Sequence, residues 1–91
     1  MSRIVRATIL GVLDGDDDLY QQLCAHGLLP DEEDALAEQH VELARVTQTL
    51  VRELEVNWAG VEIVLRMRTE LIESRRQVAE LLRVLQAQHE P

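Results

Sequence analysis

One uninterrupted helical pattern covers the last third of the chain and constrains its fold more than any other feature. In heptads counted from Val61, the a positions are Val61, Arg68, Arg75 and Leu82, and the d positions are Val64, Leu71, Val78 and Leu85. This pattern predicts an amphipathic helix over about residues 58–88, with a coiled-coil-like face that has two arginines within it. At 1.5 Å per residue such a helix spans roughly 45 Å. That is longer than a 91-residue globule needs, so its far end must find another surface.

A second copy of the chain is the simplest way to cover this face. A chain of this length buries only around 60–65% of its unfolded surface, so a monomeric core would be modest. We therefore predict a homodimer, in which the relative direction of the two helices is left open. The expected interface residues are Val64, Leu71, Val78, Leu82 and Leu85.

A short break, L-E-V-N-W-A-G-V, precedes the long helix. Asn57 is a good N-cap residue, worth about 1 kcal/mol, so the helix is expected to start near Trp58. Gly60 costs roughly 0.5–1 kcal/mol relative to Ala in a first turn, which suggests close packing against the backbone there. Trp58 is expected to fill the corner between the two flanking helices. These three residues therefore form a predicted joint between a compact head, residues 1–56, and the long helix, residues 57–91.

Two helices are predicted within the head. The first covers about residues 16–26, with aspartates in its first turn and Gly27 as a left-handed stop. The second opens at Pro30 or Asp31, where acidic residues suit the helix dipole, and ends near Val56. Residues 3–13 are compatible with either a strand or a short helix. The sequence therefore predicts an all-α fold with a compact head and a long C-terminal helix.

The apolar positions of the second head helix recur with a helical period over more than four turns. They are Leu36, Ala37, Val41, Leu43, Ala44, Leu50, Val51 and Leu54, and His40 and Thr47 fall within the same stripe. This stripe is expected to face the core of the head.

Charge is distributed unevenly along the chain, whose net charge is -8. All nine basic residues are arginines, and none lies between Ala7 and Ala44, an interval that holds ten of the seventeen acidic residues. Such an anionic surface repels polyanions, which makes nucleic acid an improbable partner. Either these acids only cap helices and keep the protein soluble, or they form a docking face for a basic protein. The residues expected to form that face are Asp17, Asp18, Glu32 and Glu33.

The sequence offers little support for catalysis, so we do not expect an enzyme. The histidines are far apart in sequence, and no phosphate loop or hydrolase motif occurs. The aspartates of residues 14–18 lack the spacing of a calcium loop, so neither a metal nor another cofactor is expected. No stretch reaches the ~20 apolar residues that span a bilayer, and no secretory signal is visible. A single cysteine, Cys24, is typical of a reducing compartment, which favours the cytoplasm.

Three segments together resemble the MerR-like chaperone-modulator family, the CbpM type. They are H-G-L-L-P at residues 26–30, L-V-R-E-L-E-V at 50–56 and N-W-A-G-V at 57–61. The family typically has G-(L/V)-(L/V)-x-P after the second helix of a helix-turn-helix and L-x-L-(D/N)-x-x-G-(I/V) before its terminal helix. Pro30 lies one place early here, and the first helix of the motif is compressed into residues 8–13. The resemblance covers residues 8–88 and implies a degenerate helix-turn-helix head.

The resemblance also implies a function, namely binding to the J-domain of a DnaJ-like cochaperone and restraint of its work with the Hsp70 chaperone DnaK. Because J-domains present a basic helix, the acidic head would complement them. The main alternative is a MerR-like transcriptional regulator that binds DNA as a dimer. Its basic face could come only from Arg3, Arg6, Arg45 and Arg52. A third possibility is a scaffold that joins DnaK and DnaJ without inhibiting either.

Overall fold

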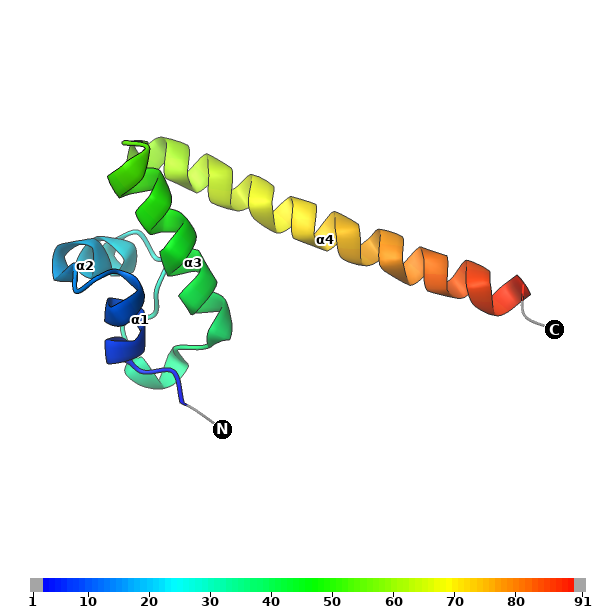
Figure 1. Cartoon of the computed structure of the whole chain (residues 1–91), viewed down its shortest axis with the longest axis horizontal. Helices are drawn as coiled ribbons and strands as arrows, with labels where there is room; N and C mark the ends of the chain where they lie inside the picture. Colours follow the sequence, from blue (N-terminus) through cyan, green and yellow to red (C-terminus); the bar gives the residue numbers. More distant parts are fainter. Residues whose placement is uncertain (1–2, 90–91) are drawn as a thin grey trace. The chain divides into compact units, whose positions relative to one another are not determined.

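The computed structural model describes residues 3–89 and is helical, with no strand in that range (Figure 1). The predicted all-α class is therefore confirmed. The helical elements are α1 (Arg6–Val12), α2 (Asp17–Ala25), the 3-10 turn η1 (Glu33–Ala35), α3 (Glu38–Gln48), the π-helical turn η2 (Thr49–Glu53) and α4 (Trp58–His89). The chain divides into two compact units, residues 1–58 and residues 59–91.

The first unit has a small aliphatic core to which α1, α2, α3 and the loop before α3 contribute. Its buried members are Ile9, Leu13, Leu19, Tyr20, Leu23, Leu29, Leu36 and Ala44. Ile9 and Leu13 are one helical turn apart, so a helix presents both to the core. This spacing explains why residues 6–12 form a helix, one of the two conformations left open by the sequence. The Thr8 hydroxyl accepts a hydrogen bond from the Val5 N–H at 3.2 Å and caps the start of α1.

Helix α2 follows its predicted limits closely. An Asp16 carboxylate oxygen accepts a hydrogen bond from the Leu19 N–H at 3.0 Å, which makes Asp16 the N-cap. At the other end Gly27 has φ of +73° and lets the chain turn back. The Leu28 N–H then donates to the Leu23 carbonyl at 2.9 Å, which satisfies one of the last carbonyls of the helix.

Helix α3 begins at Glu38, so the predicted start at Pro30 or Asp31 is wrong. Leu36 has an extended backbone and is buried in the core, which prevents a continuous helix through this point. The helix starts two residues later, where His40 Nδ1 accepts a hydrogen bond from the Ala37 N–H at 2.9 Å. The four acidic residues 31–34 consequently lie in a loop and the short turn η1, outside the first turn of α3.

The end of α3 also departs from the predicted stripe. The helix changes to π-helical geometry at Thr49 and stops at Glu53, and Glu55 has φ of +55°. Leu54 is 63% exposed, so its predicted place in the core is wrong. The π-helical turn changes which residues face the core, because its period differs from the 3.6 residues per turn that defined the stripe.

Thr47 is a buried polar residue of α3, and its replacement by Val is expected to stabilise the protein. Its side chain is fully buried, and Oγ1 has no hydrogen-bond partner among the described residues. Because Val removes the unsatisfied hydroxyl and keeps the shape, Thr47→Val should raise the free energy of unfolding by about 1 kcal/mol. Urea denaturation of both proteins at one concentration measures this difference. A destabilised variant would mean that the hydroxyl has a partner.

Helix α4 begins at Trp58, as predicted from the preceding asparagine, and reaches His89 without interruption. Within residues 3–89, no helix combines the length and the apolar character that crossing a bilayer requires.

Candidate interaction surfaces

The four acids of the predicted docking face lie at two places in the first unit. Asp17 and Asp18 occupy the first turn of α2, and Glu32 and Glu33 lie at the start of η1. All four are exposed. Arg6 connects the two places, because its guanidinium forms an ion pair with Asp17 and its backbone N–H donates to Glu33 at 2.6 Å.

Excess negative charge is confined to the first unit. Residues 1–58 contain twelve acidic and four basic residues, for a net charge of -8, whereas residues 59–91 contain five of each and are neutral. Each of the four arginines in the first unit is ion-paired with a carboxylate. The pairs are Arg3 with Asp34, Arg6 with Asp17, Arg45 with Glu42, and Arg52 with Asp16 and Asp18. None of these guanidinium groups is therefore left without an acidic neighbour.

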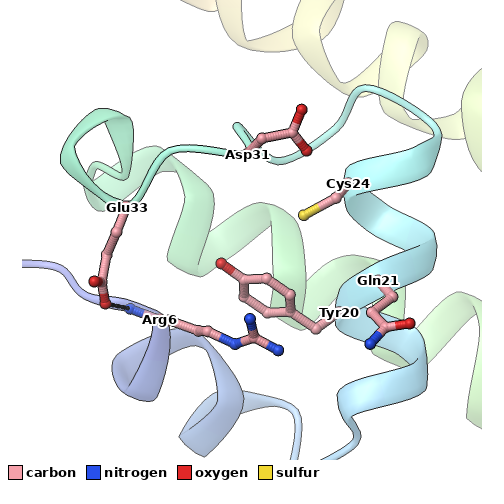
Figure 2. Close-up of a pocket in the computed structure, with 6 residues that line it drawn as sticks. All are labelled: Arg6, Tyr20, Gln21, Cys24, Asp31 and Glu33. Atoms are coloured by element: carbon pink, nitrogen blue, oxygen red, sulfur yellow. Dashed lines mark hydrogen bonds between the residues drawn. The ribbon is translucent and has the colours of Figure 1, made fainter.

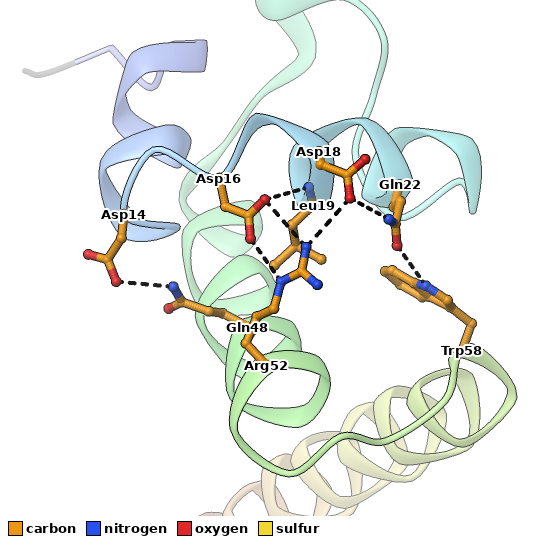
Figure 3. Close-up of polar contacts among 8 residues, drawn as sticks. All are labelled: Asp14, Asp16, Asp18, Leu19, Gln22, Gln48, Arg52 and Trp58. Atoms are coloured by element: carbon orange, nitrogen blue, oxygen red, sulfur yellow. Dashed lines mark hydrogen bonds and ion pairs between the residues drawn. The ribbon is translucent and has the colours of Figure 1, made fainter.

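A polar network joins the start of α2 to the last residue of α3 and to η2 (Figure 3). Arg52 Nε donates to Asp16 at 2.8 Å, and Gln48 donates to Asp14 at 3.2 Å. The hydrogen bond from Arg52, and then that from the Leu19 N–H, lower the pKa of Asp16. Asp16 thus serves both as a helix cap and as the link between two helices.

Asp16→Asn is expected to destabilise the protein in a pH-dependent manner. Asparagine still caps a helix, so the substitution isolates the charged contact with Arg52, worth about 0.5–1 kcal/mol. The folded pKa of Asp16 is depressed, so its contribution is complete above its ordinary value, about 4, and is lost as pH falls through the folded value. Wild type and variant should therefore differ in stability at pH 7 and converge in acid. Urea titrations at several pH values test this, and a difference that persists at the lowest pH would contradict it.

Trp58 packs on α2, and its expected place in the corner between the last two helices stays a prediction. Its ring stacks on His26, with centroids 4.3 Å apart and planes inclined by 13°. Its Nε1–H donates to the Gln22 side chain at 2.9 Å (Figure 3). Asn57 directly precedes α4 and Gly60 lies in its first turn, as the predicted joint requires.

A pocket of about 350 Å³ opens on the first unit (Figure 2). Its lining residues are Arg6, Tyr20, Gln21, Cys24, Asp31 and Glu33. The Arg6 guanidinium lies over the Tyr20 ring, 4.7 Å from its centroid. Burial raises the pKa of the Tyr20 hydroxyl and of the Cys24 thiol, so both stay protonated near neutral pH. Sequence reasoning missed this pocket, because no local motif brings residues 6, 20 and 31 together.

The second unit carries an apolar face on α4, which the polar residues 73–77 interrupt between Ile72 and Val78. All five residues of the predicted dimer interface are exposed, as that role requires. A coiled-coil seam has apolar residues at alternating steps of three and four. The exposed apolar side chains that fit this spacing best are Val64, Met67, Leu71, Val78, Leu81 and Leu85, with Ser74 at the one position that is not apolar. This register places Arg68 and Arg75 beside the stripe, where the count from Val61 had placed them in its middle. A shallow groove of about 670 Å³ lies on this face, lined by Val64, Met67, Arg68, Glu70 and Leu71.

No protein-family model matches this sequence, and neither the curated proteins nor the solved structures include one with significant similarity to it. Among the described side chains, no group of three or more His, Cys, Asp or Glu residues is placed to hold a metal ion. The two surfaces that the fold does define are an anionic helical unit and a neutral helix with an exposed apolar face.

Proposed function

We propose that this protein is a homodimeric adaptor that binds the J-domain of a DnaJ-like cochaperone in the cytoplasm and inhibits its action with DnaK. The observation that carries this proposal is the segregation of charge, with -8 in residues 1–58 and none in residues 59–91. An anionic unit attracts the basic helix of a J-domain. The role requires no catalysis and no cofactor.

The local arrangement of the first unit supports the degenerate helix-turn-helix part of the proposal. Helices α1 and α2 are joined by the four residues 13–16, which include Gly15 in a left-handed conformation with φ of +78°. Short turns that contain glycine are typical of helix-turn-helix motifs. The face that α2 would present to DNA in such a motif carries Gln21, Gln22 and His26 but no Arg or Lys.

Pairing of the arginines disfavours the alternative, a MerR-like regulator that binds DNA. Binding to DNA requires cations that neutralise phosphates, and the four arginines of the first unit already have acidic partners. A DNA complex would have to break these pairs and to overcome the surrounding acidic residues. Binding to a basic protein surface requires neither change.

The apolar face of α4 supports the dimer. Residues 59–91 have no net charge, so two copies of the helix do not repel each other electrostatically. Burial of its exposed apolar side chains stabilises a dimer by roughly 25 cal/mol per Å² of apolar surface. We assign the seam to Val64, Leu71, Val78 and Leu85, with Leu82 at its edge.

One experiment separates the two functions. The full chain is mixed with a J-domain and, separately, with duplex DNA at low salt, and binding is measured by calorimetry. Binding to the J-domain alone, weakened by added salt, is the expected result. Binding to DNA with no response to the J-domain would overturn the adaptor role. An assay of DnaK ATPase stimulation by the cochaperone then distinguishes inhibition from simple scaffolding.

Charge reversal at the docking face should slow association. Asp18→Lys combined with Glu32→Lys replaces two negative charges by two positive ones, a net change of four units, and leaves the contacts of Arg6 with Asp17 and Glu33 intact. The association rate with a J-domain should therefore fall several-fold. The matched control is Glu73→Lys with Glu80→Lys, an equal charge change on exposed residues of α4. Stopped-flow measurement of both pairs decides the matter. Equal rates would leave Asp18 and Glu32 without a role in docking.

A further inference from the structure

We infer that the pocket lined by Tyr20, Asp31 and Glu33 binds a lysine ammonium group of the protein partner. This inference rests on the proposed function, since it names the place where one basic side chain of a J-domain would insert. It adds a defined site to an acidic surface that sequence reasoning had described only by its charge.

The Tyr20 hydroxyl is the first observation that points to a ligand. The side chain is only 6% exposed, and its ring is fixed beneath the Arg6 guanidinium. Figure 2 shows the hydroxyl directed into the pocket, towards the loop that carries Asp31 and Glu33. No described residue makes a hydrogen bond with this hydroxyl, and its oxygen is not among the fully buried unpaired atoms, so it is accessible from the pocket. It can therefore accept a hydrogen bond from a donor that enters the pocket.

Charge gives the second observation, and it specifies a cation. Asp31 makes no ion pair or hydrogen bond with the described residues, so its negative charge is not neutralised within the unit. Glu33 is held in place by the Arg6 N–H, while the guanidinium of Arg6 is already paired with Asp17. The only cation in the lining is therefore already paired, and Asp31 and Glu33 both line the pocket without an ion-pair partner among the described residues.

Geometry favours lysine over arginine as the inserted side chain. Arg6 covers a face of the Tyr20 ring, so a second guanidinium cannot stack there. An ammonium group is compact and carries three donors, and the acceptors that the lining offers it are the Tyr20 hydroxyl oxygen and the carboxylates of Asp31 and Glu33. A pocket of about 350 Å³ lies near the lower end of the range of ligand pockets, about 300–1,000 Å³, and accommodates the end of a single side chain.

The test titrates the full chain with Nα-acetyl-lysine methylamide as a probe and records the backbone amide shifts of the protein by NMR. Localised shifts at the amides of Tyr20, Gln21 and Cys24 are expected, and the corresponding norleucine amide should cause none. Tyr20→Phe removes only the hydroxyl and keeps the ring in the core. This substitution should lower the affinity for the probe by about 3- to 10-fold. Asp31→Asn should weaken it several-fold, whereas Asp18→Asn, outside the pocket, should not. Shifts that are absent, spread over the surface or equal for norleucine would overturn the site.

A second arm separates this inference from the proposed function. If wild type binds a J-domain, Tyr20→Phe and Asp31→Asn should both weaken that complex, and Asp18→Asn should weaken it less. Equal affinity of wild type, Tyr20→Phe and Asp31→Asn would overturn the pocket as the docking point while the adaptor role stands. Failure of wild type to bind any J-domain, with the lysine probe still bound in the pocket, would overturn the adaptor role and leave the lysine site intact.

Discussion

Leu71→Glu is expected to convert the proposed homodimer into a monomer. Leu71 lies in the middle of the apolar seam of α4 and is 52% exposed in the isolated chain. Loss of a buried leucine removes roughly 1.5–3 kcal/mol from each of two copies, and a charged carboxylate within the seam adds a desolvation penalty. Since each 1.4 kcal/mol changes an equilibrium tenfold, the dimer dissociation constant should rise by more than about 100-fold. Sedimentation equilibrium over a range of concentrations measures this change.

Ile72→Glu is the matched control for this experiment. Ile72 is the next residue of the same helix and is 45% exposed, but it lies about 100° further around the helix, outside the seam. The substitution should leave the dimer essentially intact. If Ile72→Glu dissociates the dimer and Leu71→Glu does not, the seam is assigned to the wrong face. A wild-type chain that is monomeric at micromolar concentration would contradict the proposed dimer.

Local signals in the sequence were sufficient to predict α2 and α4. Asp16 caps α2 and Gly27 ends it, and both roles depend only on neighbouring residues. The start of α4 at Trp58 likewise follows from the short break before it. The sequence showed the apolar period of α4 clearly, but it did not determine which residues occupy the a and d positions of the heptad. Thirty residues of amphipathic pattern allow two heptad counts. Apolar residues of both counts are exposed, so only the spacing through Met67 and Leu81 favours the second.

Tertiary contacts explain where the sequence misled. Four acids after Pro30 suit the first turn of a helix, but Asp34 and Glu33 instead contact Arg3 and Arg6 near α1. Burial of Leu36 in an extended conformation fixes that loop, and no local preference signals it. Trp58 was recognised as a joint residue, yet its partners His26 and Gln22 lie more than thirty residues earlier. The Tyr20 pocket depends on the same kind of distant pairing, so its residues could not be grouped from the sequence.

The predicted docking acids were identified individually, but their contacts were not. Asp17 and Glu33 hold Arg6 and therefore contribute to the shape of the first unit. Asp18 and Glu32 are free of that constraint, which makes them the better sites for a test of steering.

Leu23→Ala is expected to destabilise the first unit by about 2–5 kcal/mol, the usual range for a buried leucine that leaves a cavity. Leu23 has no exposed surface and belongs to the same core cluster as Ile9 of α1 and Ala44 of α3. A unit of 58 residues has a free energy of unfolding of only roughly 3–9 kcal/mol, so this loss is a large part of the total. Fluorescence of Trp58, the single tryptophan, should follow the unfolding, because its ring stacks on α2.

Leu54→Ala provides the comparison, because it is the same substitution at a position that sequence periodicity also assigned to the core. Leu54 is 63% exposed, so its truncation should change the free energy of unfolding by less than about 0.5 kcal/mol. Urea transitions should be recorded at one protein concentration, since the proposed dimer would make the apparent stability depend on it. Similar losses in both variants would mean that the chain is buried beyond Glu53 and that α3 continues as the apolar period predicted. A large loss in Leu23→Ala alone would establish that the π-helical turn ends the core-facing stripe.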